Sequence, residues 1–436
     1  QQNCRILVTE PRRIAAISLA TRVAEEMGCQ LGKEVGYQVK GLSKMTHTTQ
    51  IQFATIGILI RKLIADLGEI LRYDFILIDE VHERDLQVDC LLGILKILFQ
   101  LKVQNLPKIV IMSATLDGAK FCAYFGGTTI GQFELASKLY PTETKYLDEM
   151  LDYGVRLPSK LVKQQPREED EDAELFEEVV KNDSEGIDDF QICNELIGEI
   201  ISRELAAKEG NILVFLPGLY EIQQLQDYLN KKYKFSVFPC HSQISVDQQQ
   251  KLFRLGGSNV ILATNIAEAS VTIPGVVAVI DTGLERQVSF FPRTRKYIFQ
   301  TKRISKESAA QRAGRAGRMC PGTIYRCYFQ NSFEEMAPFR KPEIQTGSLQ
   351  QIMLNLLSID QQCAHDLFQP HLFLQQLLDA PSSDKIFTNL KELWDADFIL
   401  YQAEQQNNLE KTFTAPTTRF FQTKLGNQIS KLPIEP

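Results

Sequence analysis

The sequence predicts an α/β protein with two tandem parallel-sheet units and a mainly helical domain after them. Up to about residue 127, apolar strands alternate with helical patterns, which is typical of a parallel sheet covered on both faces. The same alternation begins again near residue 190, and the final segment then shows helical periodicity without buried strands. We therefore expect domains at 1–130, 131–335 and 336–436.

The first unit opens with a strand in CRILVTEPRR, which starts at Cys4, and a helix over 15–27 that Gly28 can end. The next elements follow the same alternation. They are a strand running into a helix at 49–64, a strand at 73–81, a helix at 86–99 and a strand at 107–116. These strands are largely apolar, so we expect them to be buried in one sheet.

The second unit repeats this order. It starts with a helix over 190–208 and continues with strand NILVFLPG, helix LYEIQQLQDYLNKKY and strands FSVFPCHS, NVILATNIA and VVAVIDTG. The basic and aromatic residues alternate over 285–303, with Pro292 near the middle, which predicts a β-hairpin. In the third domain, LQQIMLNLLSI and SDKIFTNLKELWDADFIL have helical spacing.

The charge is unevenly distributed. The net charge of −6 argues against a nucleic-acid partner, but segment 167–189 alone holds 12 acidic and 2 basic residues. The rest of the chain carries 46 basic against 42 acidic residues and is therefore mildly basic. We interpret about 148–189 as an insertion in the second unit, and its acidic part as a solvated, partly disordered loop in the simplest interpretation.

The cysteines and the apolar runs indicate where in the cell the protein is expected. Nine cysteines are scattered without a C-x-x-C pair, which favours reduced thiols in an intracellular protein over a metal site. No apolar run is long enough to span a membrane, and the start of the sequence does not resemble a signal peptide. We expect a cytoplasmic protein without a membrane partner, with ribonucleoprotein granules or the nucleus as alternatives.

The stretch DFILIDEVHERD, from Asp74 to Asp85, ends an apolar strand on two carboxylates. Ligands of parallel α/β sheets bind beyond the carboxyl ends of the strands. Asp79 at such an end can hold the Mg²⁺ of a bound ATP, and Glu80 can polarise the attacking water. The alternative is a local salt bridge of the pair with Arg84.

A second group of polar residues supports nucleotide chemistry. SAT at 113–115 and TNIAEAS at 264–270 each end a predicted strand, and QRAGRAGR fills 311–318. In a helix, Gln311, Arg315 and Arg318 would lie roughly along one face. Arginines that reach a γ-phosphate from another domain stabilise transition-state charge. A basic surface helix is the alternative, although two glycines would weaken such a helix.

The motifs occur in a fixed order along almost the whole chain. They are TEPRRIAA, ATIG, DEVHER, MSATLD, ILVFLPG, CHS, ILATNIAEASVTIPGV, VIDTG, SKESAAQRAGRAGR and, at the end, LGNQISKLPIEP. In this set the chain resembles a DEAH/RHA-type superfamily 2 RNA helicase with a DEVH box. Val81 stands where this motif usually has alanine, and in this feature the chain also resembles the Spindle-E-like germline proteins.

The resemblance implies two RecA-like domains with ATP between them, RNA across their tops and a winged-helix-type domain behind. It assigns Asp79 to Mg²⁺, Glu80 to water activation and His82 to coupling with the second domain. Ser113 and Thr115 would link hydrolysis to domain movement. It assigns the nucleotide's transition-state contacts to Gln311, Arg315 and Arg318.

The resemblance also implies a track for single-stranded RNA or RNA–protein complexes. Its expected residues come from both sheet units: Arg12, Arg13, Thr55, Gly57, His241, Ser242, Thr264 and Asn265. From the residues alone, arginines after a strand and Pro11 suit phosphate contacts, while strand-end hydrogen bonding or solvent exposure are the plain alternatives. The hairpin at 285–303 would act as a wedge at a duplex junction, or else serve as a connector. Activating protein partners are also expected.

Two features depart from the family pattern. The phosphate-binding motif G-x-x-x-x-G-K-[ST] does not occur in these residues, since Gly32–Lys33 is followed by Glu34. We expect either that these residues are part of a longer protein or that the protein lacks this loop, and that these residues alone do not hydrolyse ATP. Arg303 stands where the family usually has an aromatic residue. The sequence thus predicts an ATP-dependent RNA helicase, with a non-hydrolysing RNA-binding scaffold as the alternative.

Overall fold

A computed structural model describes most of the chain. The described residues are 4–114, 118–126, 130–135, 140–153, 192–241, 244, 256–269, 273–291, 296–363, 366–402 and 417–431. They form two compact units, one from Gln1–Phe133 with Lys341–Pro436 and the other from Glu134–Arg340. The predicted three-domain division stays a prediction, because this division does not separate the first and last segments.

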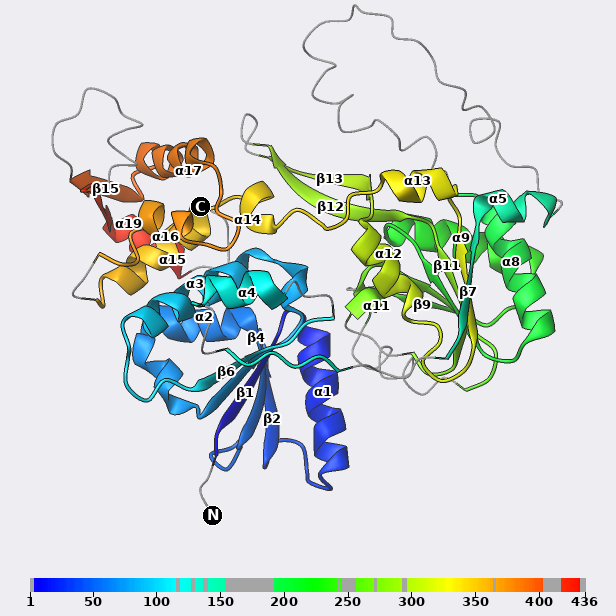
Figure 1. Cartoon of the computed structure of the whole chain (residues 1–436), viewed down its shortest axis with the longest axis horizontal. Helices are drawn as coiled ribbons and strands as arrows, with labels where there is room; N and C mark the ends of the chain where they lie inside the picture. The colour runs from blue at the N-terminus through cyan, green and yellow to red at the C-terminus, as the bar shows by residue number, and fades with distance from the viewer. Residues whose placement is uncertain are drawn as a thin grey trace, which may run out of the picture. The chain divides into compact units, whose positions relative to one another are not determined.

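The first unit contains a six-stranded sheet (Figure 1) in the order β3-β2-β4-β1-β5-β6. Its strands are β1 (Ile6–Glu10), β2 (Val35–Val39), β3 (Leu42–Lys44), β4 (Ile51–Thr55), β5 (Phe75–Ile78) and β6 (Lys108–Ile111). All neighbours pair in parallel except β2 and β3. The carboxyl ends of β4, β1, β5 and β6 therefore meet at one edge, where ligands of such sheets bind.

Helices cover both faces of this sheet, as the apolar strands predicted (Figure 1). Helix α1 (Arg13–Glu26) packs on β1, β2 and β4 through buried residues such as Ala16 and Ala20. Helices α2 (Ile56–Ala65) and α3 (Leu86–Gln100) belong to a second core together with β5. The short helices are η1 (Leu67–Arg72), η2 (Val81–Glu83) and α4 (Gly118–Tyr124).

Two local predictions for this unit had different outcomes. Gly28 does follow α1 and takes a left-handed conformation, with φ 64°, which suits a glycine after a helix. The expected burial of the strand at 107–116 is wrong for β6. This strand lies at the edge of the described sheet, and its four residues are exposed or half-buried.

The C-terminal segment packs on the first sheet unit through the same apolar core as α2 and α3. Its helices are α14 (Glu343–Thr346), α15 (Gln350–Asp360), α16 (Pro370–Gln375), α17 (Ser383–Asp395) and α19 (Lys424–Ser430). Strands β15 (Ile399–Gln402) and β16 (Arg419–Gln422) form an antiparallel pair. The helical spacing expected through residue 400 and the expected lack of buried strands are wrong here, because α17 ends at Asp395 and β15 and β16 bury Ile399 and Phe420. The winged-helix-type architecture stays a prediction.

The second unit is built on another six-stranded parallel sheet, in the order β7-β14-β11-β8-β10-β9. Its strands are β7 (Thr142–Tyr146), β8 (Asn211–Phe215), β9 (Val237–Cys240), β10 (Val260–Ala263), β11 (Val276–Asp281) and β14 (Gly322–Arg326). Its helices are α5 (Leu147–Met150), η3 (Leu151–Tyr153), α8 (Asn194–Ala207), α9 (Leu219–Lys232), α11 (Ile266–Ala269), α12 (Lys306–Ala313) and α13 (Gln330–Glu335). Strands β8, β10 and β11 are fully buried, as their apolar runs predicted.

The predicted hairpin is present as β12 (Leu284–Phe291) and β13 (Lys296–Arg303), which pair antiparallel along their whole length. Its tip at 292–295 and most of the acidic insertion, from 154 to 191, lie outside the described residues. Within the part that the structure describes, no helix is long and apolar enough to cross a membrane.

Candidate nucleotide and RNA site

The Asp79–Glu80 pair lies where the sequence predicted, directly after β5. The backbone N–H of Asp79 donates to Thr9 O at 3.0 Å, which extends the pairing of β1 and β5 by one residue. Asp79 Oδ1 accepts from the N–H of Glu80 at 2.8 Å. Glu80 itself has φ 53°, a left-handed conformation that turns the chain sharply away from the strand. Both carboxylates are thus held at the ligand-binding edge of the sheet.

The turn that follows is anchored in the core. Val81 is fully buried, and its N–H donates to Met112 O at 3.2 Å. This bond ties the short helix η2 to the residue after β6. The apolar residue between Glu80 and His82 therefore fixes the two polar residues beside it.

His82 joins the two strand ends. Its Nδ1 lies 3.2 Å from the hydroxyl oxygen of Ser113, and its Nε2 lies 3.5 Å from Glu80 Oε2. The side chain is 5% exposed, so the imidazole is enclosed between these two groups. The structure therefore brings together three of the predicted residues in one chain of contacts. Thr115, predicted beside Ser113, lies outside the described residues.

An additional carboxyl group lies beside the predicted pair. Glu10, at the end of β1, is 1% exposed, and its Oε1 has no hydrogen-bond partner among the described residues. Burial, together with the negative charges of Asp79, Glu80 and Glu83, raises the pKa of Glu10 to about 9. So much negative charge at one strand edge is stable only with protons or cations bound there.

The cluster fits a hard cation that brings other ligands with it. No three acidic, histidine or cysteine side chains in the described part of the chain are placed to hold a metal ion by themselves. Magnesium typically takes one or two carboxylates and completes its octahedron with water and phosphate oxygens. Asp79, with Glu10 and Glu80 next to it, suits that mode of binding.

The alternative interpretation of the acidic pair, a salt bridge with Arg84, is wrong. The Arg84 guanidinium instead contacts Asp89 Oδ1 at 2.7 Å and Asp379 Oδ2 at 2.6 Å. Arg84 therefore does not neutralise the Asp79–Glu80 pair.

Four predicted RNA residues of the first unit lie at neighbouring strand ends. Glu10 and Thr55 are register partners in β1 and β4, so Arg12 and Arg13 follow a strand end that lies beside the strand end of Thr55. Arg13 is exposed. Arg12 is half-buried and forms an ion pair with Glu83 at 3.3 Å, which the sequence did not predict. This pair joins the basic turn to the DEVHER turn.

Gly57 lies in the first turn of α2, where a Cβ would lie 2.7 Å from the side-chain oxygen of Gln87. This oxygen is the far end of a flexible side chain that can move aside, so the contact does not by itself require glycine at this position.

The second unit repeats this arrangement. Cys240 and Ala263 are register partners in β9 and β10, which brings His241 next to Thr264. The N–H of Thr264 donates to Cys240 O at 3.2 Å, and burial lowers the pKa of His241. Asn265 begins the turn into α11, with its carbonyl accepting from Glu268 N at 3.0 Å. Ser242 lies outside the described residues.

The predicted helical face of Gln311, Arg315 and Arg318 is wrong. Helix α12 ends at Ala313, so Gln311 is helical but both arginines lie in the turn after it. Arg318 Nε donates to Gly314 O at 3.1 Å, which folds the turn back on the helix end.

Gly317 explains why the helix cannot continue. Its φ is 73°, and a Cβ there would lie 2.6 Å from Thr142 Cγ2 and 2.9 Å from Tyr140 O. Only glycine takes this conformation in so narrow a space without strain. The second glycine of QRAGRAGR therefore shapes the arginine turn.

Arg312, which the sequence reasoning passed over, is the most enclosed charged residue of this motif. It is 0% exposed, with Nε 2.7 Å from Glu268 Oε1 and Nη1 2.7 Å from Asp281 Oδ1. Its Nη2 donates to Leu284 O at the start of β12 at 3.1 Å. Arg312 thus connects α12 with the helix after Asn265, with the end of β11 and with the hairpin.

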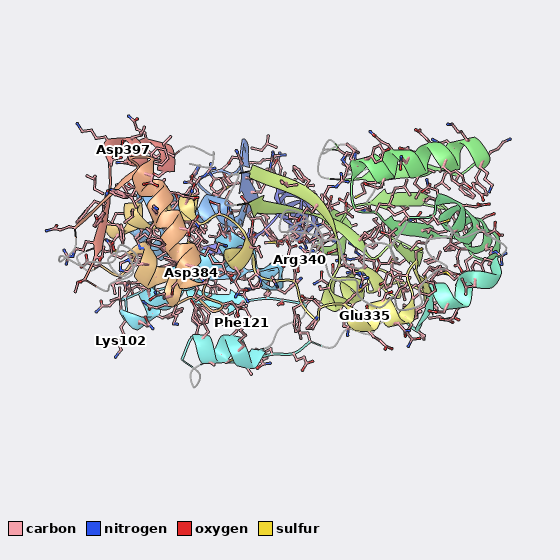
Figure 2. The ribbon with its side chains drawn as sticks, turned by 90° about the horizontal axis from the view of Figure 1, so that it is seen from above. Lys102, Phe121, Glu335, Arg340, Asp384 and Asp397 are labelled. Atoms are coloured by element: carbon pink, nitrogen blue, oxygen red, sulfur yellow. The ribbon has the colours of Figure 1, made fainter. Side chains whose placement is uncertain are left out.

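The carboxylates around Arg312 have further partners. Ser308 donates to Glu268 Oε2 at 2.8 Å, and Tyr328 donates to Asp281 Oδ2 at 3.0 Å. Arg340, labelled in Figure 2, forms an ion pair with Glu285 in β12. A buried ionic network of this kind needs every member satisfied, since an unpaired buried charge is costly.

Comparisons with known proteins agree with this geometry. Residues 191–320 match the family model "Helicase conserved C-terminal domain". The chain is 33% identical over 448 residues to ATP-dependent RNA helicase TDRD9 of Danio rerio, covering 99% of this chain and 32% of that protein. It is 33% identical over 421 residues to the probable ATP-dependent RNA helicase DHX40 of Homo sapiens, covering 91% of this chain and 48% of that protein.

A solved structure extends the comparison to the fold. The chain matches the crystal structure of the Escherichia coli DEAH/RHA helicase HrpB with a TM-score of 0.74 and 27% identity, over 98% of this chain and 47% of that one. The chain therefore spans less than half the length of each of these three proteins. The likeness to Spindle-E-like proteins within the family stays a prediction. The ordered motifs, the two RecA-like sheets and these matches show that the chain belongs to the DEAH/RHA family of helicases.

Proposed function

We propose that the protein is an ATP-dependent RNA helicase or RNA–protein remodelling enzyme. The observation that carries this proposal is the Asp79–Glu80 turn, which is held at a strand edge, linked to Ser113 through His82 and lies beside the buried carboxyl group of Glu10. Such a turn suits a phosphate-bound cation and a water molecule. The names of the relatives, ATP-dependent RNA helicases, support the same conclusion.

In the proposed mechanism, Asp79 orients a Mg²⁺ ion, which would neutralise the charge of the ATP phosphates. Glu80 accepts a proton from the attacking water. His82, enclosed between Glu80 and Ser113, transmits the position of the phosphates to the strand end after β6, with Thr115 next along the chain. Ser113 would therefore change its position when the γ-phosphate is lost.

Arg315 and Arg318 supply positive charge to the transition state, and Gln311 orients the water. The bonds of the arginine turn support this role, because Gly314 and Gly317 fix its backbone. Preorganised charge of this kind needs no rearrangement at the moment of reaction.

Single-stranded RNA is the proposed polymer. Arg12, Arg13, Thr55 and Gly57 would contact it from the first unit, and His241, Ser242, Thr264 and Asn265 from the second. Backbone contacts of this type carry little sequence preference and weaken as salt is added. The hairpin formed by β12 and β13 would separate strands at a duplex junction. The nine free cysteines support a cytoplasmic location, and protein activators are further proposed partners.

The test is phosphate release from ATP with and without single-stranded RNA, in a form of the protein that includes a phosphate-binding loop. We expect turnover that RNA stimulates and that requires Mg²⁺. RNA binding without any turnover would contradict the enzyme and favour the non-hydrolysing scaffold. A double-stranded DNA of equal length serves as the control polymer.

A further inference from the structure

We infer that the C-terminal segment positions the catalytic turn, with Asp379 and Glu343 as positioning residues that act through Arg84. The effect on turnover rests on the proposed function, whereas the effect on the turn does not. The observations concern only the first unit, to which the DEVHER turn and residues 341–436 both belong.

The DEVHER turn begins and ends on strained backbone. Glu80 has φ 53° and Arg84 has φ 48°, and neither is a glycine. Such conformations cost roughly 1–3 kcal/mol each and persist only where the surrounding structure enforces them. The contacts that hold Arg84 therefore also determine where the three residues of η2, and Glu80 before them, can lie.

The Arg84 side chain is held by two carboxylates from different parts of the chain. Its Nε and Nη2 donate to Asp89 on α3 at 2.7 and 3.1 Å, in a bidentate pair. Its Nη1 donates to Asp379 Oδ2 at 2.6 Å, and Asp379 lies between α16 and α17. Lys120 Nζ, 2.7 Å from Asp379 Oδ1, keeps that carboxylate in place. Arg84 is only 13% exposed, so these charge pairs are little screened by water.

Glu343 holds the backbone of the same turn from the start of α14. Its N–H donates to Arg84 O at 3.0 Å, and its Oε2 accepts from the N–H of Leu86 at 2.9 Å. Leu86 is the first residue of α3, whose N–H groups otherwise lack partners within the helix. The C-terminal segment thus contacts the side chain of Arg84, the carbonyl oxygen of Arg84 and the first residue of α3.

The competing explanation is an adhesive role, in which the C-terminal segment only packs on the first unit and does not position the turn. It is suggested by α15, which packs on α2 in a continuous apolar core. The two explanations differ in what the polar contacts alone should do. Apolar packing holds the segment in place when Asp379 is removed, so an adhesive role leaves the turn unchanged. A positioning role loosens the turn while the segment stays attached.

Hydrogen–deuterium exchange of the 436-residue chain distinguishes these outcomes. The N–H groups of Val81, Glu83 and Arg84 are each hydrogen-bonded and should exchange slowly. In Asp379→Ala we expect exchange over 81–86 to become at least about tenfold faster, without a similar change in α15. The matched control is Asp366→Ala, which breaks an exposed ion pair with Arg419 at 2.5 Å in the same segment. Equal exchange over 81–86 in both variants would overturn the inference.

A second measurement separates this inference from the proposed function. In a form with a phosphate-binding loop, Asp379→Ala should lower kcat about tenfold and leave the KM for ATP unchanged, and Asp379→Glu should recover most of the loss. Faster exchange with unchanged kcat would overturn the positioning role. If the unaltered protein has no turnover, the proposed function fails, while the exchange result still decides whether the C-terminal segment holds the turn.

Discussion

Arg312→Met is expected to destabilise the second unit strongly, because it removes the cation from a buried ionic network. The guanidinium is 0% exposed and lies 2.7 Å from carboxylate oxygens of both Glu268 and Asp281. Methionine has a similar length and fills much of the space, so the loss comes mainly from charge and hydrogen bonding rather than from a cavity.

The magnitude follows from the two contacts. Each attraction is worth roughly 6 kcal/mol before desolvation, at 2.7 Å and an effective dielectric constant of about 20. Removing one member of a buried pair typically costs about 3–5 kcal/mol, since the partner charge stays buried alone. At about 2–4 °C for each kcal/mol, the melting temperature of the second unit should fall by roughly 6–20 °C.

The assay is urea unfolding at pH 7, followed by a probe in the second unit. The control is Arg286→Met, which breaks the ion pair of Arg286 with Glu221. Arg286 is 35% exposed, so this change should cost at most about 1 kcal/mol. Equal stabilities of the two variants would refute this reasoning.

Three further predictions concern the arginine turn and the C-terminal segment. In a form with a phosphate-binding loop, Arg315→Ala and Arg318→Ala should each lower ATP turnover on the order of 10³-fold. The affinity for RNA in the absence of nucleotide should change little. A variant that loses RNA affinity and keeps its turnover would show that this arginine binds RNA instead. Gly317→Ala should lower the free energy of unfolding by about 2 kcal/mol, since its Cβ would lie 2.6 Å from Thr142 Cγ2. A melting temperature equal to that of the unaltered protein would contradict the left-handed conformation at this position. Burial lowers the pKa of Lys385 from 10.5 to about 8, so stability should rise between pH 8 and pH 10.5, where only the unfolded chain still holds the proton. Lys385→Met should remove about 1 kcal/mol of that rise in urea titrations, and an unchanged pH slope would show that Lys385 is not the group responsible.

The strands themselves and the positions of their polar ends could be predicted because they depend on local sequence. Apolar runs that end on Asp79 and Ser113 place these residues at the ligand-binding edge of the first parallel sheet, and the run that ends on Thr264 places this residue at the corresponding edge of the second sheet. The structure confirms the strands before all three. Their assigned roles in catalysis and RNA binding stay predictions.

The pairings between distant residues could not be predicted. Arg84 and Asp379 are 295 positions apart, and nothing in either local pattern selects one for the other. The burial of Glu10 and Arg312 has the same origin, because neighbouring strands and helices exclude water from residues that are polar in sequence. The helix expected through Arg318 failed for a related reason. Contact with Thr142 and Tyr140 requires a left-handed glycine at position 317, and helical spacing alone carries no information on that contact.

Glu80→Gln tests the central claim most directly, because it removes one charge from the turn and changes little else in size. The measurement is RNA-stimulated phosphate release beside a titration of ATP binding, in a form with a phosphate-binding loop. The control is Glu26→Gln, which alters an exposed ion pair with Arg22 on α1. We predict that Glu80→Gln binds ATP as the unaltered protein does but loses turnover, while the control keeps both. Turnover at the unaltered rate in Glu80→Gln would contradict the assignment of the water-activating group to Glu80.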